Sequence, residues 1–338
     1  MTAGAIDRDA IDRLTEAGHL SAAARDAALV QTDIIPDATA WQQFLSRLFL
    51  LLGVLFLAAA VGYFIAYNWE VLGRFAKIGL IEAGLVVAVA VALCATGDGL
   101  AARAALLMAV LLTGPLLAYV GQTYQTGADT YELFRAWALL ALPWVMVARW
   151  RPVWCLWLLL VNVSLALYVG QVWRPMAASL VDPVGALLHL SVNGLFLVVF
   201  EAWAGRYVSG SGRSVERFAL AILLAAACGL WMVFLFDYRV RTFWQPLLAI
   251  VAFVAVWWVY RRQRLDVAAL ALWCLGGIVA AMCTMGKLLS EARAESLAFL
   301  LSGVTAIALS AWAAGWLRQL HRESLAGSPA SAPAEEGA

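Results

Sequence analysis

The chain has little charge. Asp, Glu, Lys and Arg make up 13% of its 338 residues, which is about half of the roughly 25% found in soluble domains. The 23 Lys and Arg nearly balance the 22 Asp and Glu, so there is no basic excess to attract a nucleic-acid partner. Hydrophobic residues make up 64% of the chain, and this composition is typical of a protein that lies in a lipid bilayer.

Motifs of common enzyme sites are absent as well. The three histidines (His19, His189 and His321) lie in separate regions, so no zinc motif with two neighbouring histidines is present. The sequence also contains no G-x-x-x-x-G-K-[ST], no G-x-S-x-G and no G-x-G-x-x-G. The five cysteines never form a C-x-x-C pair, which argues against a disulfide framework or a metal site. We therefore expect no catalytic residues, no metal and no cofactor.

Long apolar runs dominate what is present. Ten stretches of about twenty mostly apolar residues lie between Phe44 and Trp316, and each is long enough to cross a bilayer core of about 30 Å. They lack the alternation of barrel strands, so they predict an all-α, polytopic transmembrane bundle. The fourth run is short and ends sharply at Arg149, which leaves a re-entrant hairpin open there. The expected spans are residues 44–67, 75–95, 104–123, 131–148, 153–171, 183–204, 217–235, 243–260, 267–286 and 295–316.

The segment before the first span predicts two short helices, at residues 6–17 and 21–31. Gly18 is a stop signal after the first helix, and Ser21 is a candidate N-cap for the second. The last residues are mainly Ala, Gly, Ser and Pro, which cannot bury a core. The parts expected are a cytoplasmic helix pair at 1–43, a transmembrane domain at 44–316 and a disordered cytoplasmic tail at 317–338.

The basic residues predict an orientation. With ten spans, fifteen of the 23 Lys and Arg fall on the side of the two termini and eight on the opposite side. Since Lys and Arg favour the cytoplasmic side of a membrane, both termini are expected in the cytoplasm.

An internal repeat is an alternative that the spacing leaves open. A cut after the fifth span gives two halves of five spans, which superpose after a shift of about 143 residues. Because five is odd, the halves would be inverted, an arrangement that recurs in transporters. The sequence support is one short match, between residues 74–76 and 217–219.

The strongest local signal is a polar segment at residues 121–132, between the third and fourth spans. Its amides, carboxylates and tyrosines supply hydrogen-bond donors and acceptors, and Arg135 lies one turn beyond Glu132 to pair with it. A second polar segment, at residues 67–70, ends at the same membrane face. We expect the two segments to form one outer binding site, while a solvated turn explains the first segment equally well. The expected site residues are Asn68, Glu70, Gln122, Tyr124, Gln125, Asp129 and Glu132.

Few ionisable or amide side chains lie within the spans. Glu82 lies about two turns inside the second span, and a carboxylate at such depth indicates a proton-handling or cation-handling role, or else a contact with a neighbouring helix or with Lys77. His189 and Asn193 share one face of the sixth span at i, i+4, and Asn162 lies in the fifth. These three form either part of a binding site or hydrogen bonds between helices.

Residues 67–77 (Tyr-Asn-Trp-Glu-Val-Leu-Gly-Arg-Phe-Ala-Lys) and 121–129 (Gly-Gln-Thr-Tyr-Gln-Thr-Gly-Ala-Asp) resemble the bacterial predicted-membrane-protein family called domain of unknown function 2157. The helix pair before the first span is similar to that family as well, and the resemblance covers roughly residues 5–150. It implies a bacterial inner-membrane protein and carries over no activity, substrate or catalytic residue.

Two functions therefore remain open. The first is transport or handling of a small polar or amphiphilic envelope solute through the outward-facing polar segments. The alternative is a non-transporting scaffold or accessory subunit that docks an envelope protein partner. A water-accessible cavity that reaches Glu82 or His189 would favour transport, whereas a dry and closely packed interior would favour the scaffold.

Overall fold

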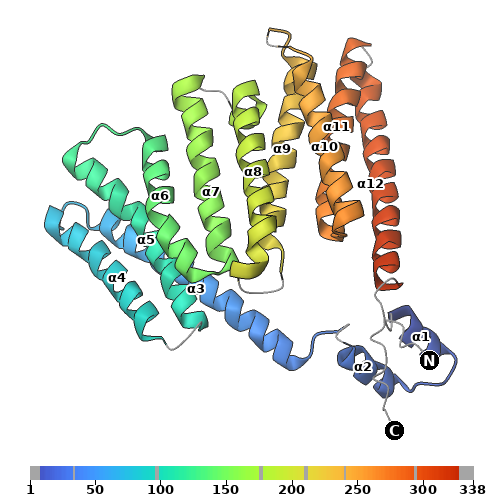
Figure 1. Ribbon diagram of the computed structural model, residues 1–338, viewed down its shortest axis with the longest axis horizontal. Helices are drawn as coiled ribbons and strands as arrows, with labels where there is room; N and C mark the ends of the chain where they lie inside the picture. The colour runs from blue at the N-terminus through green and yellow to red at the C-terminus, as the bar shows by residue number, and fades with distance from the viewer. Residues whose placement is uncertain are drawn as a thin grey trace. The chain divides into compact units, whose positions relative to one another are not determined.

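The computed structural model describes residues 8–32, 35–95, 99–174, 178–208, 212–239, 241–292 and 295–326. Within these ranges the chain forms helices and no strand (Figure 1). The main helices are α1 (Arg8–Glu16), α2 (Ala22–Gln31), α3 (Ala38–Tyr67), α4 (Arg74–Cys94), α5 (Leu100–Tyr124), α6 (Thr130–Ala148), α7 (Arg151–Tyr168), α8 (Pro183–Tyr207), α9 (Ser214–Phe236), α10 (Trp244–Trp258), α11 (Val267–Glu291) and α12 (Glu295–Ala326). Short helical segments are η1 (Val169–Trp173), η2 (Ser179–Val181) and η3 (Val259–Gln263).

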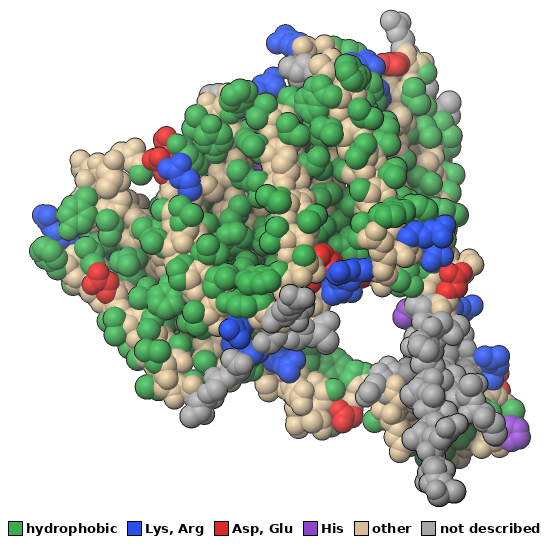
Figure 2. Space-filling view, in the orientation of Figure 1, with side chains coloured by type: hydrophobic (Ala, Val, Ile, Leu, Met, Phe, Trp, Pro, Cys, Tyr) green, Lys and Arg blue, Asp and Glu red, His purple; other side chains and the backbone are tan. Residues whose placement is uncertain are grey.

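The prediction of an all-α bundle with ten spans is confirmed. Ten of the described helices, α3 to α12, are long and apolar enough to cross a membrane, η1 and η3 extending two of them. Hydrophobic side chains cover the visible sides of these helices, and charged side chains gather mainly at the helix ends (Figure 2). The chain is therefore a membrane protein with multiple spans.

Several helices extend beyond the apolar runs that predict them. α3 begins at Ala38 and α12 continues to Ala326, because hydropathy marks only the apolar part of a helix and polar residues continue its backbone hydrogen bonds. Residues 327–338 of the expected tail lie outside the described residues. The fourth span, where a hairpin was the alternative, is the continuous 19-residue helix α6.

The chain divides into two compact units, residues 1–50 with 311–338 and residues 51–310. In the first unit α1 and α2 form where the sequence predicts them. The Ser21 hydroxyl caps α2 by accepting a hydrogen bond from a backbone N–H at 3.2 Å. Arg25 of α2 donates a 2.7 Å hydrogen bond to Asp12 of α1, so the two helices are joined by charge as well as by packing.

In the second unit α9 is the central helix, since it packs against α7, α8, α10 and α11. α4, α5, α6 and α7 pack in series, each against the next. The closest approach in this unit is at Gly229 of α9, where an added Cβ would lie 1.7 Å from the carbonyl oxygen of Leu180. Only a glycine lets the segment before α8 pack directly against the α9 backbone.

Tryptophan indoles join neighbouring helices. The Nε1–H groups of Trp137, Trp157 and Trp273 donate to backbone carbonyl oxygens of the adjacent helix at 2.7, 2.9 and 2.9 Å. Each bond satisfies a polar group inside an apolar interface. These three tryptophans therefore join helices within the bundle.

The five-plus-five repeat stays a prediction, but two helix ends resemble each other. α7 and α10 both end in a π-helical turn followed by an arginine with extended backbone, Arg174 (φ −142°, ψ 90°) and Arg264 (φ −144°, ψ 89°). The next helix then begins at an aspartate, Asp182 or Asp266, whose Oδ1 accepts two backbone N–H bonds at 3.0 or 3.1 Å. These two ends are three spans apart, whereas the expected repeat has a period of five.

Candidate functional site

A cavity of about 780 Å³ lies between the C-terminal end of α5 and the N-terminal end of α6. α5 ends at Gln125, which has a left-handed backbone (φ 47°) and donates its N–H to the carbonyl of Gly121. Gly127 has φ 68°, and this reversal brings the chain back to begin α6 at Thr130. The cavity therefore lies within the polar segment that the sequence singles out.

Three of the expected site residues line the cavity: Gln122, Asp129 and Glu132. Arg135 lines it as well and pairs with Glu132 at 3.2 Å, which confirms the predicted pair. Asp129 precedes α6 at the N-cap position, but its side chain makes no capping hydrogen bond. The carboxylate is therefore available to a ligand, and these three charged side chains carry a net charge of −1.

The rest of the lining is mostly apolar and comes from facing surfaces of α5 and α6. A volume of this size falls in the range of roughly 300–1,000 Å³ that small-molecule sites occupy. Apolar walls next to a few directed polar groups suit a ligand with an apolar body and a polar end. The apolar residues include Leu117, Val120, Leu133 and Leu139.

Four other expected residues do not line this cavity. Tyr124 and Gln125 are exposed at the end of α5. Asn68 lies just after α3, and its amide donates to the carbonyl of Phe64 in that helix at 2.9 Å. Glu70 is exposed. The structure thus brings together Gln122, Asp129 and Glu132 and leaves the 67–70 segment out of the cavity lining.

That segment contacts α5 through its tryptophan. The ring centroids of Trp69 and Tyr119 lie 5.6 Å apart, edge to face. The Lys77 ammonium lies 3.8 Å from the Trp69 centroid, and Lys77 is only 6% exposed. A cation over an indole face is a stabilising contact, so this lysine joins the start of α4 to the loop before it.

Glu82 lies on an exposed face of α4. It does not pair with Lys77, because five residues along a helix correspond to roughly 140° of rotation and Lys77 faces Trp69 instead. Glu82 is not among the residues that line the α5/α6 cavity. The structure therefore shows Glu82 as an exposed carboxylate, apart from both Lys77 and the cavity.

His189, Asn193 and Asn162 form one buried hydrogen-bonded network between α7 and α8. Asn162 Oδ1 accepts from Asn193 at 2.7 Å and from Nδ1 of His189 at 2.8 Å. Because an amide oxygen only accepts, Nδ1 of His189 carries a proton and donates it to this bond. Nε2 of His189 lies 3.0 Å from the Ser179 hydroxyl, so both ring nitrogens are hydrogen-bonded.

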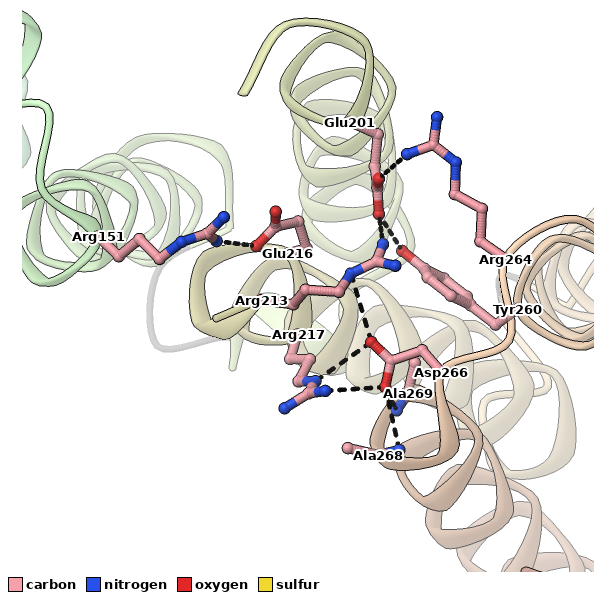
Figure 3. Close-up of polar contacts among 10 residues, drawn as sticks. All are labelled: Arg151, Glu201, Arg213, Glu216, Arg217, Tyr260, Arg264, Asp266, Ala268 and Ala269. Atoms are coloured by element: carbon pink, nitrogen blue, oxygen red, sulfur yellow. Dashed lines mark hydrogen bonds and ion pairs between the residues drawn. The ribbon is translucent and has the colours of Figure 1, made fainter. Parts of the chain in front are cut away.

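The largest group of ionic contacts lies where α7, α8, α9, η3 and α11 have neighbouring ends (Figure 3). Arg151 contacts Glu216 at 2.6 Å, and both side chains are largely buried. Glu201 pairs with Arg213, and with Arg264 at 2.5 Å. We call these side chains, with Arg217, Tyr260 and Asp266, the α8–α11 ionic cluster.

Asp266 is the most constrained member of the ionic cluster. Its Oδ1 caps α11 and lies 3.0 Å from Arg217, while its Oδ2 lies 3.4 Å from Arg213. Burial alone would raise the pKa of this carboxyl, but the hydrogen bonds from Arg217 and Ala269 and the charges of Arg217 and Arg213 outweigh burial and lower it. Asp266 is therefore ionised at neutral pH.

Sequence reasoning missed this cluster, since its pairs are distant in sequence. Arg151 and Glu216 are 65 residues apart, and Glu201 and Arg264 are 63 apart. The available signal was the presence of both acidic and basic residues at the ends of the expected spans. Within the part of the chain that the structure describes, no group of three or more His, Cys, Asp and Glu residues is placed to hold a metal ion.

Residues 12–154 match the family model described as predicted membrane protein (DUF2157), which confirms the resemblance found in the sequence. No curated protein and no solved structure matches the chain. The matched residues include both walls of the α5/α6 cavity, whereas the ionic cluster lies almost entirely beyond them. The family description names a membrane protein and no activity.

Proposed function

We propose that this membrane protein binds a small amphiphile whose polar end carries an amine, in the cavity between α5 and α6. The cavity opens to the outer face of a bacterial inner membrane in this proposal, and both termini lie in the cytoplasm. The distribution of Lys and Arg supports that orientation, since fifteen of 23 fall on the side of the termini. Binding there is the first step of transport or handling of an envelope solute.

One observation carries the proposal. Asp129 lies at the N-terminal end of α6, but its side chain does not cap the helix. Its carboxylate lines a cavity whose walls are otherwise largely apolar. Glu132 is already paired with Arg135, so among the described residues of the cavity Asp129 supplies the negative charge that has no fixed partner. An ammonium group satisfies that charge, and a hydrocarbon chain fills the space beside Leu117 and Leu133.

The test uses three probes with one chain length and different polar ends: octylamine, octanol and octanoate. The purified protein is placed in nanodiscs, and the shift of its thermal unfolding midpoint is measured with each probe. We expect octylamine to stabilise most. Asp129→Asn should weaken octylamine binding about fivefold, since a partly exposed ion pair contributes up to about 1 kcal/mol.

Asp237→Asn is the matched control, because Asp237 is a carboxylate just after α9 and does not line the cavity. It should bind octylamine as the wild type does. Equal stabilisation by all three probes, or an unchanged octylamine affinity in Asp129→Asn, would refute an amine site at this position.

A membrane scaffold or accessory subunit is the second candidate, and the burial of two helices favours it. In the apolar windows of α3 and α12, 11% and 6% of the residues are buried, compared with 56% in α5 and α9. A second protein chain that packs against either helix would cover this apolar surface. Crosslinking in membranes from Phe56 or Trp312, both exposed, tests this alternative: a specific protein adduct supports it, and adducts with lipid alone oppose it.

A further inference from the structure

A second cavity, distinct from the α5/α6 cavity, lies between α8 and α10 and has a volume of about 540 Å³. Both helices pack against α9, and Leu223 of α9 contributes to the lining. The small residues Gly194, Ala202, Ala252 and Ala255 leave open space between the two helix surfaces. The result is an apolar groove, which we call the α8/α10 groove.

The length of the groove corresponds to one leaflet of a bilayer. Its lining on α8 extends from Leu190 to Ala202, and on α10 and the start of η3 from Leu248 to Val259. At a rise of about 1.5 Å per residue, these stretches are roughly 17–18 Å long. One leaflet of the hydrocarbon core is roughly 15 Å thick, so an extended acyl chain fits along the groove.

The groove has one polar end, where it meets the ionic cluster (Figure 3). Glu201, Tyr260, Gln263 and Arg264 line it there. Glu201 is held by Arg213, by Arg264 at 2.5 Å and by the Tyr260 hydroxyl at 3.2 Å. The carboxylate at this end is therefore neutralised, and the Arg264 side chain remains 52% exposed.

Positive charge is in excess at this end. The ionic cluster contains four arginines and three carboxylates, and Arg262 precedes Arg264 in the chain. These five arginines exceed the three carboxylates by two charges. Arg262 is exposed, so a guanidinium can reach a group at the mouth of the groove. Such an end attracts an anionic head group.

We propose that the α8/α10 groove binds one phospholipid with an anionic head group, with an acyl chain between α8 and α10 and the phosphate beside Arg262 and Arg264. The groove combines a leaflet-length apolar wall with a basic end, and a phospholipid has the same two parts in the same order. In the proposed orientation this end faces the cytoplasm, so the lipid comes from the inner leaflet. Bound lipid would join α8 to α10 next to the ionic cluster.

The test measures lipid binding to the full chain after detergent exchange has removed bound lipid. Phosphatidylglycerol and phosphatidylcholine with identical acyl chains are titrated separately, and binding is followed by native mass spectrometry and by the thermal unfolding midpoint. We expect one bound phosphatidylglycerol per chain and weaker binding of phosphatidylcholine. Arg262→Gln should weaken phosphatidylglycerol binding about fivefold, as expected for one basic residue at a membrane surface.

Ala255→Trp places an indole in the groove and should reduce binding of both lipids, because Ala255 lines the groove and is exposed. Ala83→Trp is its control, at an exposed position of α4, and Arg239→Gln is the control for Arg262→Gln, at an exposed arginine after α9. Both controls should bind lipid as the wild type does.

Three results would overturn the proposal. Unchanged lipid binding in Ala255→Trp shows that the acyl chain lies elsewhere. If glycerol phosphate stabilises the protein as much as phosphatidylglycerol does, the site binds free anions and not a lipid. If the protein is a dimer that Ala255→Trp dissociates without any change in bound lipid, a second copy of the chain occupies the groove.

Discussion

Nδ1 of His189 lies 2.8 Å from Oδ1 of Asn162, and this hydrogen bond joins α8 to α7 where both side chains are buried. The same oxygen accepts from Asn193. Nδ2 of Asn162 in turn donates to Oδ1 of Asn193 at 3.2 Å. A change at Asn162 therefore removes three hydrogen bonds between helices and leaves polar groups of His189 and Asn193 without their partners on α7.

We predict that Asn162→Leu lowers the free energy of unfolding by about 1–3 kcal/mol, the cost of leaving buried polar groups unsatisfied. Denaturant unfolding in detergent measures this. Asn68→Leu is the control, because the Asn68 amide makes a local bond to the last turn of the preceding helix α3, and it should change stability by less than about 0.5 kcal/mol. Equal effects of the two substitutions would contradict a stabilising network.

We predict that Asp266 makes the stability of the folded protein depend on pH in acid. Its pKa is lowered in the folded protein, so the stability that it contributes is fully present above the ordinary aspartate pKa of about 3.9 and is lost as the pH falls through the lower, folded value. Asp266→Asn keeps an N-cap oxygen but removes the charge. We expect this variant to be less stable than the wild type at pH 7 and to lose less stability on acidification.

Unfolding midpoints measured between about pH 7 and pH 3 check this prediction. Asp26→Asn serves as the control, since the Asp26 side chain is 74% exposed and should contribute little at pH 7. A pH dependence in Asp266→Asn as steep as that of the wild type would assign the acid response to other groups.

At Glu82 we predict that substitution raises the stability of the protein, whereas the substitutions at Asn162 and Asp266 lower it. An exposed carboxylate on a membrane-spanning helix is costly when lipid surrounds it. Glu82→Leu should therefore raise the thermal unfolding midpoint, and Glu82→Gln should raise it less. If both substitutions instead abolish the cellular phenotype of the gene while the protein stays folded, Glu82 faces an aqueous path or a functional partner.

The parts of the fold that the sequence predicts are those that local signals determine. Apolar runs mark α3 to α12 because a bilayer requires about twenty apolar residues for each span. Ser21 caps α2 as expected, and Arg135 pairs with Glu132 because residues three apart share a helix face.

Contacts between distant segments could not be predicted in the same way. Lys77 was a candidate partner for Glu82, but it packs on Trp69 in the preceding loop. Arg213 contacts both Glu201 and Asp266, which come from two other helices. Only the packing of α8 and α11 against α9 brings these charges together, and hydropathy does not encode which helices pack.

The candidate site was half predictable for the same reason. Residues 121–132 are continuous in sequence, so their composition shows a polar segment. Whether residues 67–70 join it depends on which face of α5 each segment meets. Trp69 meets Tyr119, and Tyr119 is not part of the cavity lining.

The central claim is that the α5/α6 cavity faces outward and holds a ligand beside Asp129. Labelling of single cysteines with a membrane-impermeant maleimide in spheroplasts tests this most directly, in a chain whose five cysteines have been replaced (Cys94, Cys155, Cys228, Cys274 and Cys283). Ala128→Cys, which lines the cavity and keeps Asp129, and Asp237→Cys should be labelled from outside, and Gly99→Cys only after permeabilisation. Octylamine should slow labelling at position 128 and leave position 237 unchanged. Labelling of Ala128→Cys only after permeabilisation would contradict the orientation, and labelling from outside at a rate that octylamine does not change would contradict the binding site.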